Sequence, residues 1–111
     1  MIRASKESTN GTSYYGDNII ATANEIEAIV GALPEYDYDK SQRTWCAEFS
    51  YLDEDGDVCW TTFTIYDWKE FRTIGDDDVI DYHIGAFNRT ESNKALESFK
   101  EEFKELIRKS Q

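Results

Sequence analysis

The chain has 111 residues, of which 40% are hydrophobic and 14% aromatic, and its formal net charge is −11. This length suits a single domain over residues 1–111, and the aromatic content separates it from disordered acidic tails. The net charge disfavours binding to nucleic acid or acidic membrane surfaces, because both are negatively charged. Fourteen Asp and Glu but only four Lys and Arg lie between Glu35 and Tyr82, so this stretch holds −10 of the charge.

The beginning of the chain has no signal of export. Residues 1–6 lack the apolar run of a signal peptide, and no stretch approaches the roughly 20 apolar residues of a membrane span. We therefore expect a cytoplasmic protein without membrane association, as a monomer or small homo-oligomer.

The first elements are read from local signals. Residues 1–13 are polar and without period, which predicts a loose N-terminal arm leading into a short strand near Tyr14 and Tyr15. Thr22 to Glu25 has the pattern of a capping box, and a helical apolar period follows it as far as Gly31. A helix over about 22–31 is predicted.

Residues 35–42 are acidic and aromatic without an apolar period, which predicts an exposed connection. From Arg43 the hydrophobic period switches to two, as in a strand with one buried face. Its apolar positions are Trp45, Ala47, Phe49 and Tyr51.

A hairpin is expected to follow this strand. Residues 54–56 read as a three-residue loop whose Gly56 takes a left-handed conformation in a G1 bulge. Asp53 then opposes Asp57, and the apolar residues of both strands gather on one side. A two-residue loop would shift the pairing and place Phe63 opposite the polar face, which the hydrophobic pattern resists.

The register also separates the two cysteines. Cys46 opposes Thr64 on the polar face, whereas Cys59 opposes Tyr51 on the core face. Because their side chains point to opposite sides of the sheet, no disulfide is expected.

The rest of the chain predicts one more strand and a helix. Residues 79–86 suggest a third main strand, paired with one of the first two. Residues 91–109 carry an amphipathic helix capped by Ser92 or Thr90, with Phe99 and Phe103 facing the sheet.

These elements predict an α+β two-layer sandwich in the order strand, helix, three strands, helix. The antiparallel sheet has three main strands, with the short N-terminal strand as a fourth, and both helices cover one face. Trp60, Tyr66 and Trp68 lie on the opposite, nominally solvent-facing side. Either a loop covers them or they form a binding surface.

The sequence predicts no enzyme. His83 is the only histidine, and Cys46 and Cys59 are the only thiols, but no nucleophile motif surrounds either cysteine. No glycine-rich phosphate loop is present, so no cofactor is expected.

Two acidic loops invite a metal interpretation. Asp53 to Asp57 resembles a calcium loop in its alternating carboxylates, yet an EF-hand needs twelve residues between two helices, and here a strand follows. A solvated hairpin tip is the preferred interpretation, with weak cation binding as the alternative. The same holds for Asp76 to Asp78, so no metal site is predicted.

One pair of motifs carries a family resemblance. Thr64 to Lys69 reads Thr-Ile-Tyr-Asp-Trp-Lys, and a later strand contains His83, Ile84 and Gly85. Over residues 12–90 the chain resembles small proteins carried by phages and other mobile elements. This resemblance implies a phage-type source, hence the cytosol of a host cell, and no established chemistry. The structural alternative is that Asp67 accepts backbone amides, Trp68 packs the strand edge and Gly85 permits a tight turn.

Two functions are compatible with these features. The first is an anti-defence inhibitor that binds a basic surface of a host nucleic-acid-handling protein, as a DNA mimic does in anti-CRISPR or anti-restriction proteins. Its expected contact residues are Asp53, Glu54, Asp55, Asp57, Asp76, Asp77 and Asp78. The alternative is a module that binds a small ligand or nucleotide through an aromatic patch of Trp60, Tyr66, Trp68 and His83. Acidity that serves only solubility is the plain rival of the first function.

Overall fold

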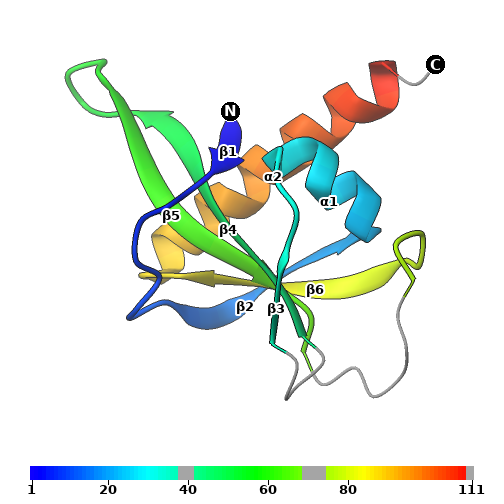
Figure 1. Ribbon diagram of the computed structural model, residues 1–111. Helices are drawn as coiled ribbons and strands as arrows, with labels where there is room; N and C mark the ends of the chain where they lie inside the picture. The colour runs from blue at the N-terminus through cyan, green and yellow to red at the C-terminus, as the bar shows by residue number, and fades with distance from the viewer. Residues whose placement is uncertain (38–41, 69–74, 110–111) are drawn as a thin grey trace.

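The computed structural model describes residues 1–37, 42–68 and 75–109, and Figure 1 shows how their elements are arranged. In chain order these are β1 (Ile2–Ala4), β2 (Ser13–Ala21), α1 (Ala23–Val30), β3 (Glu35–Asp37), β4 (Gln42–Leu52), β5 (Val58–Tyr66), β6 (Ile80–Ala86) and α2 (Arg89–Lys109). Neither helix is long and apolar enough to cross a membrane.

One antiparallel sheet contains all six strands. Its order is β1-β4-β5-β6-β2, and β3 also pairs with β4, beside the start of that strand. Helix α2 packs on β2 and β6, and α1 contacts α2 and β1. The predicted α+β class, antiparallel sheet and two helices are confirmed, but the prediction of three main strands and their order is wrong.

The missed strands are short edge segments. Ile2 opposes Phe49 and is buried, so the first residues form a strand where a loose arm was predicted. Glu35 opposes Thr44, so β3 replaces part of the predicted exposed connection, of which residues 38–41 lie outside the described chain. Segments of three residues are too short to show a period, and only the neighbouring β4 gives their backbone groups partners.

Strand β2 is longer than the short strand predicted near Tyr14. It runs for nine residues, and its register against β6 shifts between Tyr14 and Asn18. Gly16 lies inside this irregularity with φ +97°. A bulge adds one residue to the strand, so the alternation of inward and outward side chains changes phase there. The sequence therefore does not show one continuous alternating pattern over β2.

The central hairpin follows the predicted register. Trp45 opposes Ile65, and Phe49 opposes Thr61. Cys46 opposes Thr64, Cys59 opposes Tyr51, and both thiols are free. The prediction that the cysteines are unbonded is confirmed.

Helix α1 begins and ends as its local sequence predicted. Thr22 accepts the Glu25 amide at 3.1 Å, and the Glu25 carboxylate accepts the Thr22 amide at 2.9 Å. Gly31 ends the helix in the left-handed region, with φ +80°. Ile26 and Val30 face the core.

Helix α2 begins two residues earlier than expected. Its cap is Asn88, whose Oδ1 accepts the Glu91 amide at 2.8 Å. The predicted cap Ser92 is instead buried inside the first turn, where its hydroxyl donates to Asp17 at 2.6 Å. Phe99 is buried in the core, and Phe103 is partly buried against it.

The segment between β1 and β2 joins the two edges of the sheet across the face opposite the helices (Figure 1). The Ser5 hydroxyl lies 3.2 Å from that of Thr62, which is buried although it points away from the helices. Part of the outer face, at Thr62, is therefore covered by the chain itself, whereas Trp68 stays 50% exposed.

Candidate functional site

The β4–β5 hairpin projects from the body of the molecule and ends in an acidic loop (Figure 1). Its ladder closes at Leu52 and Val58, and beyond them the Asp53 amide donates to the Asp57 carbonyl at 2.9 Å. The Gly56 amide donates to the Asp53 carbonyl at 3.1 Å, and Gly56 has φ +82°. This is the predicted three-residue loop.

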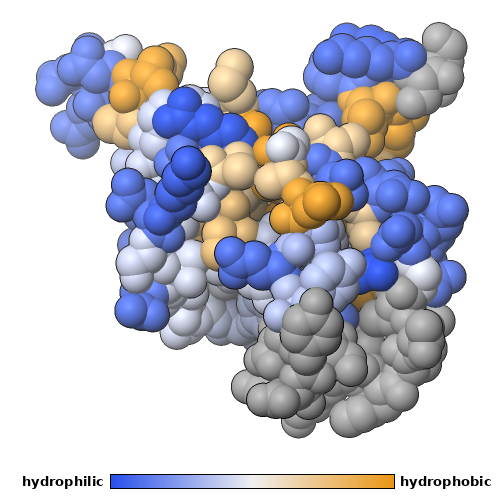
Figure 2. Space-filling view, in the orientation of Figure 1, coloured by the Kyte–Doolittle hydropathy of each residue, from blue (hydrophilic) through white to orange (hydrophobic). Residues whose placement is uncertain are grey.

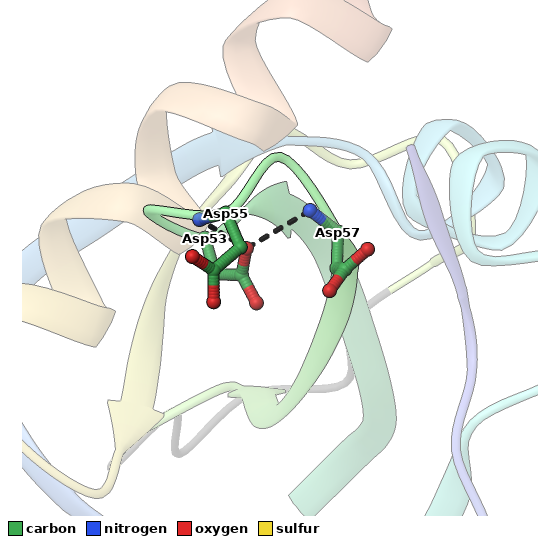
Figure 3. A group of neighbouring side chains, drawn as sticks. All are labelled: Asp53, Asp55 and Asp57. Carbon is green, nitrogen blue, oxygen red and sulfur yellow. Dashed lines mark hydrogen bonds between the residues drawn. The ribbon is translucent and has the colours of Figure 1, made fainter.

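The carboxylate of Asp53 organises that loop (Figure 3). Its Oδ1 accepts the amides of Asp55 and Asp57, each at 2.9 Å, and its Oδ2 lies 3.6 Å from Cys59 Sγ. These donors, the Asp57 amide first, stabilise the charged form and hold the pKa of Asp53 below its ordinary value. One carboxylate thus serves as the internal brace of the hairpin tip.

The same three aspartates could be considered as cation ligands. Carboxylate oxygens of Asp53, Asp55 and Asp57 lie within 4.8 Å of one another. Calcium takes six to eight oxygen ligands, and Asp53 already accepts two amides. The position of the Asp53 carboxylate is accounted for by the hydrogen bonds of the loop.

The hairpin tip is not uniformly polar. Leu52 and Val58 are 68% and 63% exposed, and they flank the loop that carries the exposed carboxylates of Glu54, Asp55 and Asp57. Figure 2 shows hydrophobic side chains directly beside hydrophilic ones at the end of this arm. The tip therefore offers an exposed apolar pair next to negative charge, and protein-binding surfaces likewise combine apolar with polar side chains.

The second acidic loop, residues 75–79, is bonded to the body. Asp76 accepts a hydrogen bond from the Arg43 guanidinium at 2.9 Å, and its carbonyl accepts the Asn24 amide at 3.2 Å. Asp77 accepts the side-chain amide of Asn24 at 2.6 Å. Asp78 accepts an amide within the loop at 2.7 Å. All three predicted contact residues thus have an internal role.

The two acidic loops lie on opposite sides of the molecule (Figure 1). Asp53, Glu54, Asp55 and Asp57 sit at the end of the hairpin, whereas residues 76–78 lie beside α1. The structure therefore does not bring the seven predicted contact residues onto one face.

Arg43 lies at the anchor of the second loop. It is only 8% exposed, and its guanidinium lies 5.9 Å from the Tyr36 ring. Burial opposes its charge, but Tyr36, Tyr82 and Asp76 outweigh that effect, so its pKa stays above the ordinary value. Asp67, 2% exposed, accepts the Arg43 backbone amide at 2.6 Å. The predicted structural role of Asp67 is confirmed.

An aromatic cluster occupies the outer face of the sheet. The rings of Tyr66 and His83 lie 5.5 Å apart, and that of Trp68 stacks on His83 at 6.2 Å. Tyr14 joins them from β2, with its ring 4.0 Å from His83 and nearly parallel to it. Three of the four predicted patch residues therefore meet, together with one that sequence reasoning missed.

Trp60, the fourth predicted member, lies apart. It opposes Ser50 near the hairpin, and the Arg3 guanidinium stacks 3.6 Å above its ring. Arg3 also pairs with Glu48 at 2.6 Å. Along one strand, residues 60 and 66 are too far apart to share a ligand, since each residue advances the chain by about 3.3 Å.

Gly85 gives the Thr64 side chain room beside the aromatic cluster. It sits in β6 opposite Thr64, so the predicted tight turn is wrong. A Cβ at this position would meet Thr64 Oγ1 at 2.4 Å and the Tyr66 ring at 3.5 Å. The glycine leaves the space that the Thr64 hydroxyl fills, and the Tyr66 ring is only in ordinary contact with that space.

His83 is held in its neutral form. Burial lowers its pKa, and the nearby Asp81 only partly opposes this. Asn18 donates to Asp81 at 2.7 Å and accepts the Tyr14 hydroxyl, which ties β2 to this cluster. At neutral pH the cluster is therefore an uncharged aromatic surface beside one carboxylate.

Comparison with known protein families, curated proteins and solved structures found no significant match. The function is therefore argued from the residues and geometry described above. Among those residues, the projecting hairpin tip and the aromatic cluster are two surfaces whose composition suits recognition.

Proposed function

We propose that this protein binds a basic surface of another protein through the tip of the β4–β5 hairpin and thereby inhibits it. The observation that carries the proposal is the projecting arm, whose exposed Leu52 and Val58 lie next to the exposed carboxylates of its loop. The apolar pair would bury against the partner, and the carboxylates would face its Lys and Arg side chains. Charge complementarity of this kind steers encounter and gives specificity.

The target class follows from the charge. A basic surface complementary to an acidic arm is typical of nucleic-acid-handling proteins, including those of host defence, and the resemblance to phage-borne proteins favours such a target. Mimicry of DNA is proposed for the tip alone, because Asp76, Asp77 and Asp78 are bonded on the other side. The inhibitor would occlude a basic site with one arm.

The test is capture of basic proteins from a bacterial host lysate on the immobilised protein. We expect capture at low ionic strength and release at high salt, because exposed charges are screened. Asp55→Lys with Asp57→Lys should abolish capture. Glu97→Lys with Glu101→Lys makes the same change in net charge on α2, where both residues are exposed, and should retain most of it.

Three results would contradict the proposal. Capture that persists at high salt, capture that survives the hairpin reversal, or equal losses with both charge reversals would each remove the tip as the contact. A captured protein must also lose its own nucleic-acid binding when the parent protein is added, or inhibition by occlusion is wrong.

A second function is favoured by a separate observation. One aromatic surface is formed by the rings of Tyr14, Tyr66, Trp68 and His83. The first, second and fourth lie on β2, β5 and β6, and Trp68, which follows β5, is half exposed. Such a surface could stack a flat ligand. An anionic ligand would also need a cation close to the rings. Arg43 is buried and paired with Asp76, and Lys69 and Arg72 lie outside the described chain.

Tryptophan fluorescence separates this function from the first. A ligand that stacks on the cluster should quench Trp68 in the Trp60→Phe variant and leave Trp68→Phe unaffected. A panel of nucleosides, nucleotides and aromatic metabolites that changes neither spectrum would remove the aromatic cluster as a ligand site.

A further inference from the structure

Strand β2 forms one edge of the sheet. It stands last in the strand order, and among the described residues only β6 pairs with it. Residues Asn18–Ala21 pair with β6 without interruption. In an antiparallel pair, every second residue turns its N–H and C=O away from the partner strand. The outer edge of β2 therefore presents backbone groups that another strand can bind.

An apolar groove of about 370 Å³ lies between this edge and helix α2. Its apolar lining includes Ile19 from β2 and Leu96, Phe99 and Phe103 from α2. Ile20, on the same stretch of β2, is 70% exposed. An unpaired strand edge and an apolar groove thus lie side by side.

Two lysines border the groove. Lys100 and Lys104 are one helical turn apart on α2, and both are exposed. In the described parts of the chain, no carboxylate lies within ion-pair distance of either lysine. In a protein of net charge −11, this groove therefore has two exposed cations at its rim.

We propose that β2 and the groove bind an extended peptide segment of another protein that carries apolar side chains and an acidic residue. The segment would add a strand to the sheet at Asn18–Ala21 by main-chain hydrogen bonds. Alternate side chains would enter the groove against Phe103 and Leu96, and a carboxylate would pair with Lys100 or Lys104. A small amphipathic anion would satisfy the lysines and the groove but leave the strand edge unused.

The probe is the peptide acetyl-Asp-Val-Thr-Val-Asp-amide. Its binding to the full chain is measured by NMR of the protein's backbone amides. We expect slower hydrogen exchange at alternate amides of Asn18–Ala21 and shifted signals from Ile19 and Leu96. Lys100→Gln with Lys104→Gln should weaken binding by up to about fivefold, as expected for the loss of one exposed ion pair. Lys94→Gln with Lys109→Gln makes the same change in charge away from the groove and should bind like the parent.

Two N-methylated peptides test the strand pairing itself. A strand that adds to an edge uses only one of its two sides, so N-methylation at odd or at even positions should abolish binding in one peptide and spare it in the other. If both bind like the unmodified peptide, strand addition is wrong.

Three other results would also overturn the proposal. One is that dodecanoate binds in the groove while the peptide does not, which would make this a site for small amphipathic anions. Another is that the alternate amides are protected at high protein concentration without peptide, which would make a second copy the occupant. The third is that the peptide shifts no signal at β2 or α2. The hairpin reversal Asp55→Lys with Asp57→Lys should leave peptide binding unchanged, so this result is independent of the function proposed for the tip.

Discussion

The two acidic loops differ in what their carboxylates bind. In the 75–79 loop, Asp76 pairs with the nearly buried Arg43, and Asp77 bonds to Asn24 at the start of α1. In the hairpin tip, one carboxylate, Asp53, braces the loop, and its neighbours are exposed to solvent. Similar runs of aspartate therefore attach the 75–79 loop to the body, whereas in the hairpin tip most of them face solvent.

This difference matters because composition alone makes the two loops look equivalent. A carboxylate bonded to a partly buried cation contributes to stability, whereas a fully exposed one contributes little to folding and is available to a partner. Charge reversal should therefore affect folding at the 75–79 loop and binding at the hairpin tip.

The largest effect on the free energy of unfolding is expected from substitution of Arg43. Arg43→Met keeps an apolar stem but removes the cation that holds Asp76 and lies beside the buried Tyr82. The free energy of unfolding should fall by about 2 to 3 kcal/mol. Urea denaturation measures this. Asp76→Asn, which alters only the exposed partner, should cost less than about 1 kcal/mol; equal losses in both variants would mean that the burial of Arg43 is unimportant.

Charge reversal in the 75–79 loop should have the next largest effect on stability. Asp76→Lys with Asp77→Lys places a cation against Arg43 and removes the acceptor of the Asn24 side chain. A loss of about 1 to 2 kcal/mol in the free energy of unfolding is expected. A variant as stable as the parent would show that the loop is not attached as the hydrogen bonds indicate.

A smaller effect with a pH signature is expected at Asp53. Its pKa is lowered in the folded state, so the charged form stabilises the fold above its unfolded pKa, near 3.9, and this contribution is lost as the pH falls through the folded pKa. Asp53→Asn should therefore be less stable than the parent at pH 7 and similar to it near pH 2. Urea midpoints at both pH values test this, and a difference that does not change with pH would contradict it.

The smallest effect on folding is expected from the hairpin reversal. Asp55→Lys with Asp57→Lys changes exposed side chains, and the free energy of unfolding should stay within about 0.5 kcal/mol of the parent. The same variant should lose partner capture. Thermal melts beside the capture assay check both halves, and a destabilised variant would mean that the tip carboxylates support the fold.

Much of the fold could be predicted because its signals are local. The Thr22 and Glu25 capping box lies within four residues, and the loop ending in Gly56 sets the register of both strands that flank it. Helix α2 follows from a stripe of apolar residues at helical spacing. Each of these elements is selected by contacts between residues that are near in the chain.

The candidate site could be predicted only in part. Tyr66, Trp68 and His83 were expected together and do meet, but Tyr14 reaches His83 only because β2 pairs with β6 across a bulge. Trp60 has the same side-chain chemistry, yet its place on the strand puts it beside Arg3. The distances between such residues depend on strand order, which no local pattern encodes.

The sequence by itself determined the helices, the central hairpin and the large negative charge, because these depend on neighbouring residues or on composition alone. Only the tertiary structure decided that β1 and β3 are strands, that the two acidic loops face apart, and that Lys100 and Lys104 border a groove at the β2 edge. Each of these features joins segments distant in the chain. Their positions are set by long-range pairing and burial, which exist only once the sheet and its helices have packed.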